Sequence, residues 1–369
     1  MKLAILGTRG IPANYGGFET FAEELATRLV SRGHDVTVYG RSNNIRYRDR
    51  IYKGVKLTIL PTIGTKHLDT IAHTFLSVFH ALPRRFDCIL MCNAANAIFA
   101  LVPRLTGTPV ALNVDGIERL RKKWGGPGRA YYRLSEYLAT IIPNAVVTDA
   151  NVIRDYYLKK YRKPSVTIAY GAHCERLETT TALSQLGVQS QEYFLYVSRL
   201  EPENNAHMVI EAFEKLPTQK KLLIVGDAPY ARAYINRLKS TRDSRVRFAG
   251  AIYGIGYREL QSHAFAYIQA TEVGGTHPAL IEAMGASNCV IAKDTPENRE
   301  VLGDCGLFFN DAAGLAHEIE RTLEDGALVQ RLRTKALERA KAHYSWDAVT
   351  DAYEKLFRDL FSREAATRL

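Results

Sequence analysis

Short apolar runs alternate with longer amphipathic stretches over the first half of the chain. The runs are typical of buried parallel strands, and the stretches repeat apolar residues with the period of a helix. We expect strands at residues 3–6, 36–39, 57–60, 88–91, 110–113, 145–148 and 166–169. We expect helices at residues 18–32, 68–81, 95–105, 129–142 and 151–161. This alternation predicts an α/β fold with a parallel sheet wrapped by helices, and therefore a Rossmann-like domain over residues 1–175.

The same alternation restarts after a weakly patterned connection at residues 174–191. Candidate strands lie at residues 193–197, 221–225, 246–249, 266–269, 289–292 and 307–309, and candidate helices at 206–216, 230–239, 256–263, 278–285 and from 312 onward. This pattern predicts a second Rossmann-like domain over residues 190–343. Two such domains facing each other leave a cleft at the carboxyl ends of their sheets, which is where open α/β sheets bind ligands.

The stretch ATEVGGTHPALIEAMG, residues 270–285, is the strongest candidate for a ligand site. Gly274 and Gly275 lead through Thr276 and His277 into a helix that starts at Pro278, a residue favoured in the first helical turn. The amino end of a helix attracts anions, and glycines let a ligand approach the backbone closely. One turn further on, Glu282 is placed to accept hydrogen bonds from sugar hydroxyls. A diphosphate beside a polyol describes a nucleotide sugar.

A dinucleotide-binding oxidoreductase is the first alternative, and the sequence argues against it. Its fingerprint is GxGxxG directly after the first strand, with an acidic residue at the end of the second. Here the first loop reads GTRGIPANYGG, and the second strand ends in Tyr39-Gly40-Arg41. Gly16 and Gly17 lie just before the first helix, again at a positive helix end. We therefore interpret this loop as a wall of the cleft that approaches the donor from the first domain.

Composition indicates the cellular compartment in which the protein is expected. The 369 residues are 46% hydrophobic, and no apolar run approaches the roughly 18 residues that a membrane-spanning helix needs. The amino terminus, MKLAILGTRG, resembles a first strand more than a signal peptide. The five cysteines are scattered without a CxxC pair, which favours reduced thiols. These features predict a soluble protein in the cytoplasm.

Seven motifs in this order resemble the GT-B glycosyltransferases, specifically the large retaining group called family 4. They are the GlyGly loop, RGHDVTVYG, YVSRLEPENN, LLIVGDAP, VRFAGAIYGIGYREL, GGTHPALIEAMG and DTPENREVLGDCGLFF. The openings GTRGIPANYGGFET and NVDGIERLRKKW look like the bacterial subgroup that includes polysaccharide rhamnosyltransferases. The resemblance covers both domains and implies the GT-B architecture, in which a C-terminal helix, residues 344–369 here, crosses back to the first domain.

The resemblance implies roles for individual residues. Arg199 matches the arginine that pairs with the donor diphosphate and assists its departure, and Glu282 matches the glutamate that holds the donor ribose. The second phosphate cation of the family falls at Asn204, so that contact is missing or replaced. The resemblance implies that Gly226 and Asp227 line the nucleotide side. Ile252 and Tyr253 match the segment that packs on the base.

The first glutamate of the family's pair should stand at position 274, but this chain has Gly274. A deoxysugar donor with fewer hydroxyls to recognise, such as dTDP-rhamnose, is compatible with this departure. Gly275, Thr276 and His277 still supply hydrogen-bond donors there. In the first domain, Asp115 is the polar candidate that orients the acceptor hydroxyl or accepts its proton, or else only caps a turn.

The net charge of +10 is concentrated in the first half of the chain. Residues 119–137, RLRKKWGGPGRAYYRLSEY, interleave basic and aromatic side chains. With a GT-B architecture behind them, we expect Arg121, Lys122, Lys123 and Trp124 to contact an anionic membrane that holds a lipid-linked acceptor. A solvated helix is the alternative, and nucleic acid is not an expected partner.

The sequence therefore predicts a retaining glycosyltransferase on the inner face of the plasma membrane. It would transfer L-rhamnose from dTDP-rhamnose to a polyprenyl-diphosphate-linked saccharide in bacterial surface polysaccharide synthesis. No DxD pair stands at a strand end, so we expect no metal and no cofactor. The alternatives are a transferase of the same fold that uses a UDP- or GDP-sugar, a nucleotide-sugar epimerase, and a catalytically inactive sugar-nucleotide-binding protein.

Overall fold

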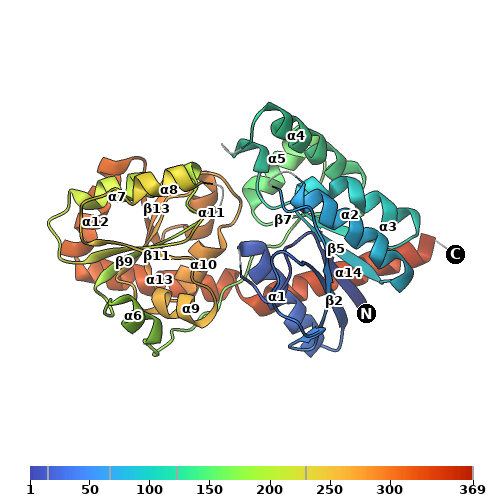
Figure 1. Ribbon diagram of the computed structural model, residues 1–369, viewed down its shortest axis with the longest axis horizontal. Helices are drawn as coiled ribbons and strands as arrows, with labels where there is room; N and C mark the ends of the chain where they lie inside the picture. Colours follow the sequence, from blue (N-terminus) through green and yellow to red (C-terminus); the bar gives the residue numbers. More distant parts are fainter. Residues whose placement is uncertain (15, 66–67, 122–123, 229–230, 368–369) are drawn as a thin grey trace. The chain divides into compact units, whose positions relative to one another are not determined.

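The chain forms two compact units in a computed structural model, which describes residues 1–14, 16–65, 68–121, 124–228 and 231–367. The first unit comprises Met1–Tyr170 together with Trp346–Leu369, and the second comprises Gly171–Ser345. The chain thus leaves the first unit after Tyr170 and returns to it at Trp346 (Figure 1).

The first unit is built on an eight-stranded sheet in the order β3-β4-β2-β1-β5-β6-β7-β8. All neighbouring strands are parallel except β3 and β4, which form an antiparallel pair at one edge. The strands are β1 (Lys2–Leu6), β2 (Asp35–Arg41), β3 (Ile51–Tyr52), β4 (Val55–Leu60), β5 (Cys88–Cys92), β6 (Val110–Asn113), β7 (Ala145–Thr148) and β8 (Val166–Thr167). Their side chains are buried on both faces in β1, β2 and β5, as expected for strands covered by helices on each side.

Helices cover both faces of this sheet because strands are added on both sides of β1, so that the crossovers run in two opposite directions along the sheet. The connection from β1 to β2 carries α1 (Gly17–Ser31) onto one face, where α14 (Trp346–Thr367) joins it. The crossovers from β4 toward β8 carry the other helices onto the opposite face, as the right-handed rule requires. These are α2 (Asp69–Ala81), the 3-10 segments η1 (Leu82–Arg84) and η2 (Ala94–Ala100), α3 (Leu101–Leu105), α4 (Gly126–Ile141) and α5 (Asn151–Tyr161).

The C-terminal helix α14 is part of the first unit, as the sequence predicts. The Arg32 guanidinium lies 2.6 Å from Oδ1 of Asp351, and His34 Nε2 lies 3.0 Å from Oε1 of Glu354. Those contacts lower the pKa of the Glu354 carboxyl, chiefly through the hydrogen bond to His34. Deeper in the interface, the Asn113 side-chain amide donates to the hydroxyl of Tyr353 over 2.9 Å. Tyr353 is fully buried, so this bond fixes the register of α14 on the sheet.

The second unit contains a six-stranded parallel sheet in the order β11-β10-β9-β12-β13-β14. The strands are β9 (Tyr193–Val197), β10 (Lys221–Val225), β11 (Val246–Gly250), β12 (Ala266–Gln269), β13 (Cys289–Lys293) and β14 (Gly306–Phe309). The order reverses between β9 and β12, because the chain first builds outward to β11 and then returns to the other side of β9. Such a reversal is where the carboxyl ends of an open sheet expose a crevice for ligands.

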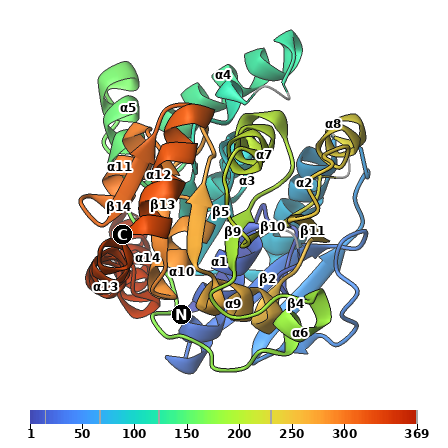
Figure 2. The ribbon, with the colours of Figure 1, turned by 90° about the vertical axis from the view of Figure 1, so that its left-hand side faces the viewer.

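The helices of the second unit lie on both faces of its sheet (Figure 2). One face carries α7 (Ala206–Glu214), α8 (Arg232–Leu238) and α12 (Ala312–Glu324). The other carries α9 (Gly254–His263), α10 (Pro278–Gly285) and α13 (Gly326–His343), with α6 (Thr181–Leu186) against α9. Helix α11 (Pro296–Leu302) begins after Thr295, whose side chain accepts the N–H of Asn298.

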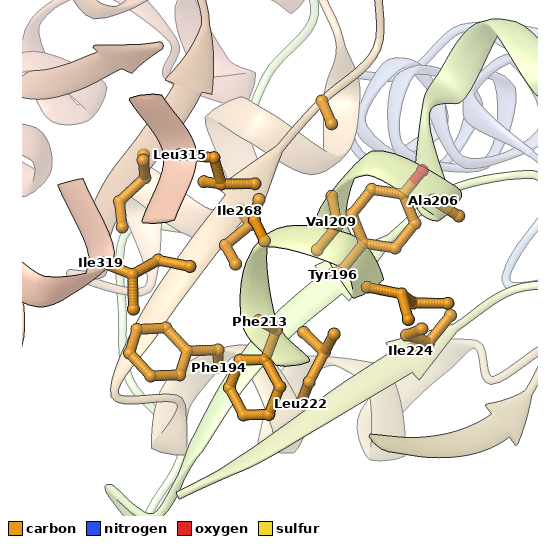
Figure 3. Packing of buried hydrophobic residues seen from close by; sticks show 14 of the residues in the cluster. Phe194, Tyr196, Ala206, Val209, Phe213, Leu222, Ile224, Ile268, Leu315 and Ile319 are labelled. Atoms are coloured by element: carbon orange, nitrogen blue, oxygen red, sulfur yellow. The ribbon is translucent and has the colours of Figure 1, made fainter. Parts of the chain in front are cut away.

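The main core of the second unit lies between the sheet and the helices α7 and α12 (Figure 3). Phe194 and Phe213 meet edge to face with their ring centroids 6.0 Å apart. Ile268 from β12 and Leu315 from α12 pack into the same cluster and are fully buried. Continuous burial of this kind is what keeps the strand-end loops of the sheet in fixed positions.

The predicted strands are all present, whereas some helical segments and one strand were not anticipated. The two-residue strand β3, the short helix α6 and the helix α11 have too few apolar repeats to stand out in the sequence. The helix predicted at residues 95–105 is a 3-10 segment followed by one α-helical turn and a half. All five cysteines are free thiols, as predicted, and four of them are buried. Within the described ranges, no helix is both long and apolar enough to cross a membrane.

Candidate functional site

Two loops of the second unit lie side by side because the strands that precede them, β9 and β12, are neighbours. Residues 198–205 follow β9 and residues 270–277 follow β12. The side-chain amide of Asn205 donates to the carbonyl of Ala270 over 2.9 Å, and the N–H of Glu272 donates to the carbonyl of Glu203 over 3.2 Å. These bonds fasten one loop to the other. The predicted diphosphate residue Arg199 and the glycine loop therefore belong to one rigid edge of the sheet.

Gly226 has a structural requirement that explains why this position is glycine. Its φ of +144° is unfavourable for other residues, and a Cβ there would overlap the carbonyl oxygen of Ser198 and lie 2.9 Å from its carbonyl carbon. The close approach lets the Ser198 N–H donate to Val225 over 3.1 Å. Asp227, the next residue, is exposed, and its carboxylate accepts the N–H of Ala228 over 2.7 Å. Gly226 thus joins the loops after β9 and β10.

Arg199 lies in the β9 loop with its side chain 32% exposed, and its guanidinium is 4.0 Å from the Glu201 carboxylate. A planar guanidinium that remains accessible is suited to a diphosphate. Asn204 occupies the position of the second phosphate cation that the resemblance implies. Its side chain is buried and donates to the carbonyl of Arg199 over 2.6 Å. Asn204 therefore stabilises the loop that carries Arg199 and adds no positive charge.

The glycine loop ends at α10, whose N-cap residue is His277. The carbonyl of His277 accepts the N–H of Leu280 over 3.0 Å. Gly275 and Thr276 are buried, and the His277 ring lies directly against Gly274. A Cβ on Gly274 would overlap Cε1 of that ring. The imidazole therefore takes the space of the side chain that position 274 lacks.

Glu282 accepts a hydrogen bond from a tyrosine of α9, and a second residue of that helix supports the tyrosine. The hydroxyl of Tyr257 donates to Oε2 of Glu282 over 2.8 Å, and the side-chain amide of Gln261 donates to the Tyr257 oxygen over 2.7 Å and to the carbonyl of Ala279 over 3.2 Å. Desolvation, and then the Glu282 charge, raises the pKa of the Tyr257 hydroxyl well above its usual range, so it remains a donor. Tyr257 and Gln261 were not predicted as site residues from the sequence. Their spacing of four residues on one helix face is a signal, but it does not show which carboxylate they meet.

Ile252 and Tyr253 lie in the loop between β11 and α9. Tyr253 is the N-cap residue of α9 and its side chain is 43% exposed, while Ile252 is half-buried. Gly250 and Gly254 flank them with positive φ angles of 71° and 65°. The loop therefore presents an aromatic ring to solvent, in contrast to a core position.

In the first unit, Asp115 follows β6 in a left-handed backbone conformation, with φ of +56°. Its N–H donates to the side-chain oxygen of Asn113 over 3.0 Å, and its Oδ1 accepts the hydroxyl of Tyr170 over 3.0 Å. Burial, and then the Asp115 charge, raises the pKa of Tyr170 well above its usual range. A strained non-glycine residue held by two partners is a common feature of functional sites.

Gly16 and Gly17 stand at the start of α1, with Gly16 as the N-cap residue. Glu19 in the next turn, which was not predicted as a site residue, is buried and accepts the N–H of Arg9 over 2.8 Å. Burial raises the pKa of the Glu19 carboxyl, against the lowering effect of the Arg9 bond and charge. A Cβ on Gly16 would lie 3.5 Å from Oε2 of Glu19. Glu19 therefore ties the long loop after β1 to α1.

Of the four residues expected to contact a membrane, the structure describes Arg121 and Trp124, and it contradicts the expectation for Arg121. Arg121 is buried, and its Nε lies 2.6 Å from the Glu118 carboxylate. The Trp124 ring N–H donates to the same carboxylate over 3.3 Å, and its ring packs on Tyr132 at 5.0 Å. Lys122 and Lys123 lie outside the described residues. The prediction that Arg121 lies on an exposed docking surface is therefore wrong, because Glu118 draws it inward.

Two families match the chain in consecutive segments. Residues 1–173 match a family described as "Domain of unknown function (DUF1972)", and residues 191–325 match "Glycosyl transferases group 1". The second segment contains Arg199, the glycine loop and Glu282.

Curated relatives resemble parts of the chain. The O-antigen chain mannosyltransferase B of Escherichia coli is 24% identical over 181 residues, covering 47% of each protein. The lipopolysaccharide core biosynthesis glycosyltransferase LpsD of Rhizobium meliloti is 32% identical over 165 residues, covering 40% of this chain and 43% of the relative. The matches thus span less than half the length of these two relatives.

Solved structures resemble the whole chain. Sucrose-phosphate synthase from Thermosynechococcus elongatus superposes with a TM-score of 0.81 at 19% identity, covering 98% of this chain and 99% of that one. The Anabaena protein HepE, in complex with UDP and glucose, gives 0.78 at 18% identity, covering 98% and 100%. The chain therefore has the GT-B fold of these glycosyltransferases, and its second unit carries the segment that matches the group 1 glycosyltransferase family.

Proposed function

We propose that this chain is a glycosyltransferase that moves a sugar from a nucleotide-diphosphate donor to a lipid-linked saccharide, in the assembly of a bacterial lipopolysaccharide or O-antigen. One observation carries the proposal. Arg199, the glycine loop and Glu282 lie at the carboxyl edge of one sheet, inside the segment that matches the group 1 glycosyltransferases. The names of the E. coli and Rhizobium relatives, an O-antigen chain mannosyltransferase and a lipopolysaccharide core biosynthesis glycosyltransferase, support the class of polysaccharide.

Each residue has a role in this proposal. Arg199 and the N–H groups at the start of α10 bind the donor diphosphate and stabilise the charge that develops as it leaves. Glu282, oriented by Tyr257, accepts hydrogen bonds from the free hydroxyls of the donor's pentose, of which a dTDP donor has one, at the 3′ position. Asp115 orients the acceptor hydroxyl or takes its proton, because the carboxylate is fixed by Tyr170. We propose that the configuration of the transferred sugar is retained and that no metal takes part.

For the donor, we propose dTDP-rhamnose. The motivation is the absence of a carboxylate at Gly274 and the His277 ring that fills the space beside it. An imidazole offers fewer polar contacts than a carboxylate to a fully hydroxylated hexose, whereas a 6-deoxysugar presents an additional methyl group that it can contact. The acceptor places the reaction at the inner face of the plasma membrane.

The test is thermal stabilisation of the purified protein by a panel of dTDP, UDP, GDP, ADP, NAD, dTDP-rhamnose and UDP-GlcNAc. A ligand at 100 times its Kd adds about 2.7 kcal/mol to stability. We expect a shift with dTDP and a larger one with dTDP-rhamnose. A preference for UDP or GDP compounds would discard the rhamnose donor and keep the transferase. A response to NAD alone would overturn the proposed function.

A further inference from the structure

The helical layer over one face of the first sheet exposes a group of large apolar side chains. They come from α2, from η2 with α3, and from α4, and we call them the apolar face: Phe75, Phe79, Ile98, Leu105, Leu134 and Ile141. Each is 46% exposed or more, and Leu105 is 78% exposed. Isolated exposed apolar residues are ordinary on a protein surface, but a gathered set marks an interaction site.

The three helical segments are neighbours, with η2 packed against both α2 and α4 (Figure 1). Phe75 of α2 meets Phe99 of η2 with ring centroids 6.3 Å apart. The hydroxyl of Tyr131 in α4 donates to the carbonyl of Ala95 in η2 over 2.7 Å. Arg104 of α3 donates to the carbonyl of Ile141 at the end of α4 over 3.5 Å.

Within each segment the exposed residues share one side. Phe75 and Phe79 are four residues apart, and Ile98 and Leu105 are separated by seven, as are Leu134 and Ile141. These spacings return to the same side of a helix. The opposite sides of the same segments supply buried residues such as Val78, Ala97 and Ala139 to the core of the unit. The apolar face is therefore the outer surface of the layer.

The exposed charges on the elements that carry the apolar face have one sign. Arg84, Arg104, Arg129 and Arg133 are exposed on the same elements. The carboxylates that these elements carry are Asp69 and Glu136, and both are buried against arginines. Asp69 lies 2.6 Å from Arg41, and Glu136 lies 2.9 Å from Arg119. Every charge that α2, η1, η2, α3 and α4 present to solvent is therefore positive or carried by a histidine.

From this combination we infer that the apolar face is the surface by which the protein docks on an anionic lipid bilayer. Leucine, isoleucine and phenylalanine side chains enter the boundary between headgroups and acyl chains, while the arginines meet lipid phosphates. A protein partner or a second copy of this chain would be expected to present carboxylates to these arginines. It would also be expected to carry basic groups of its own, which would pair with carboxylates on the apolar face. The inference rests on the proposed function for its biological setting, since that acceptor lies in a membrane, but it concerns binding alone.

The test is flotation of the full-length protein with vesicles of phosphatidylcholine and phosphatidylglycerol, compared with vesicles of phosphatidylcholine alone. We expect binding to the anionic vesicles that weakens with salt. A triple variant, Phe79→Ser, Leu105→Ser and Ile141→Ser, should lower the partition coefficient by a factor of about 10 to 100, from the apolar area no longer inserted. A pair of charge reversals, Arg129→Glu and Arg133→Glu, should lower it by at least about fivefold for each lost arginine.

Matched controls come from exposed residues away from the apolar face. Ile51→Ser removes an exposed apolar side chain from β3, and Arg242→Glu makes the same charge reversal in the second unit. Both should bind vesicles like the wild type. Unchanged binding by the triple variant would overturn the inference. The inference would also be overturned if the wild type does not bind vesicles but self-associates in sedimentation experiments, and if the triple variant abolishes this self-association.

Donor binding separates this inference from the proposed function. The triple variant should keep the wild-type thermal shift with nucleoside diphosphates, which also shows that it is folded. If no nucleotide sugar stabilises the wild type but vesicle binding depends on the apolar face, the docking surface stands and the proposed function fails. If donors stabilise the wild type but vesicles do not bind it, the proposed function stands and the docking surface fails.

Discussion

The His277 imidazole lies in the space that a side chain on Gly274 would need. A Cβ at position 274 would overlap Cε1 of the ring and lie 3.0 Å from Nδ1. No positive φ is involved at Gly274, so the restriction is steric and comes from a single neighbour. The two positions are therefore coupled, and a larger residue at one calls for a smaller residue at the other.

Replacing Gly274 by glutamate tests this coupling. We expect the G274E variant to lose about 1–3 kcal/mol of stability, as other overpacked sites do, because the ring must move. Thermal unfolding measures the loss. Combining G274E with His277→Ala should recover most of it, with His277→Ala alone as the reference. If G274E alone is as stable as the wild type, the ring moves at no cost and the coupling is absent.

Arg199→Ala should reduce transfer by a factor of about 100 to 1,000, as the loss of one donor to a developing negative charge does in other enzymes. The melting temperature should stay close to that of the wild type, because the Arg199 side chain is partly exposed and its loop is held by Asn204 and Asn205. Initial rates with radiolabelled donor provide the measurement. Arg242→Ala is the matched control, since it removes an exposed arginine from the same unit. Equal turnover by the Arg199→Ala variant would remove this residue from the site.

Tyr257→Phe removes the hydroxyl that orients Glu282. A hydrogen bond to a charged group contributes about 1.5–3 kcal/mol, so we expect the Kd for a nucleoside diphosphate to rise about tenfold or more. Titration calorimetry measures this directly. Tyr253→Phe makes the same chemical change on an exposed ring and should leave the Kd near its wild-type value. The effect should also be larger for UDP than for dTDP, which has one ribose hydroxyl fewer. A Kd that is unchanged in Tyr257→Phe would show that Glu282 needs no orientation.

His73 predicts how the stability of the first unit depends on pH. Burial, and then the Arg41 charge, lowers the pKa of this histidine from 6.5 to about 4. The unfolded chain therefore takes up a proton near pH 6.5 while the folded unit does not. The contribution of His73 to the free energy of unfolding is fully present above pH 6.5. It is lost as the pH falls toward 4, by up to about 3 kcal/mol.

Urea unfolding at several pH values checks this expectation. Both tryptophans, Trp124 and Trp346, belong to the first unit, so intrinsic fluorescence reports on that unit. His73→Gln keeps a donor for the Gly40 carbonyl, which His73 Nε2 contacts at 3.0 Å, and does not titrate. This variant should show a flatter dependence between pH 6.5 and 4. Identical slopes would mean that other groups control the acid sensitivity.

Much of the fold could be predicted because buried parallel strands leave continuous apolar runs. Tyr193–Val197 and Lys221–Val225 are such runs, and the structure places both in the second sheet. Gly226 was predicted only to line the nucleotide side, and its close approach to Ser198 became evident in the structure. Candidate site residues that follow strands were therefore located within the correct loops, although their roles remain predictions.

The remainder depends on contacts that no local pattern encodes. Arg121 looks like part of a basic surface, but the Glu118 carboxylate three residues earlier pairs with it in a buried position. Phe75 and Phe79 look like core residues because α2 is apolar on most sides, yet only the side that meets the sheet is buried. Tyr257 meets Glu282 from a different helix, 25 residues away in the sequence. Such pairings are decided by tertiary packing.

The return of α14 to the first unit has a consequence for synthesis of the protein. Domains begin to fold as they leave the ribosome, amino terminus first. The first sheet is complete once β8 has emerged, but the partner of Asn113, the Tyr353 hydroxyl, is made only after the whole second unit. Until then the surface of α1 that later packs on α14, including Phe21, remains uncovered in the nascent chain. A chaperone that recognises apolar helices has a defined interval in which to bind, and a ribosome that stops before Trp346 releases a first unit without its last helix.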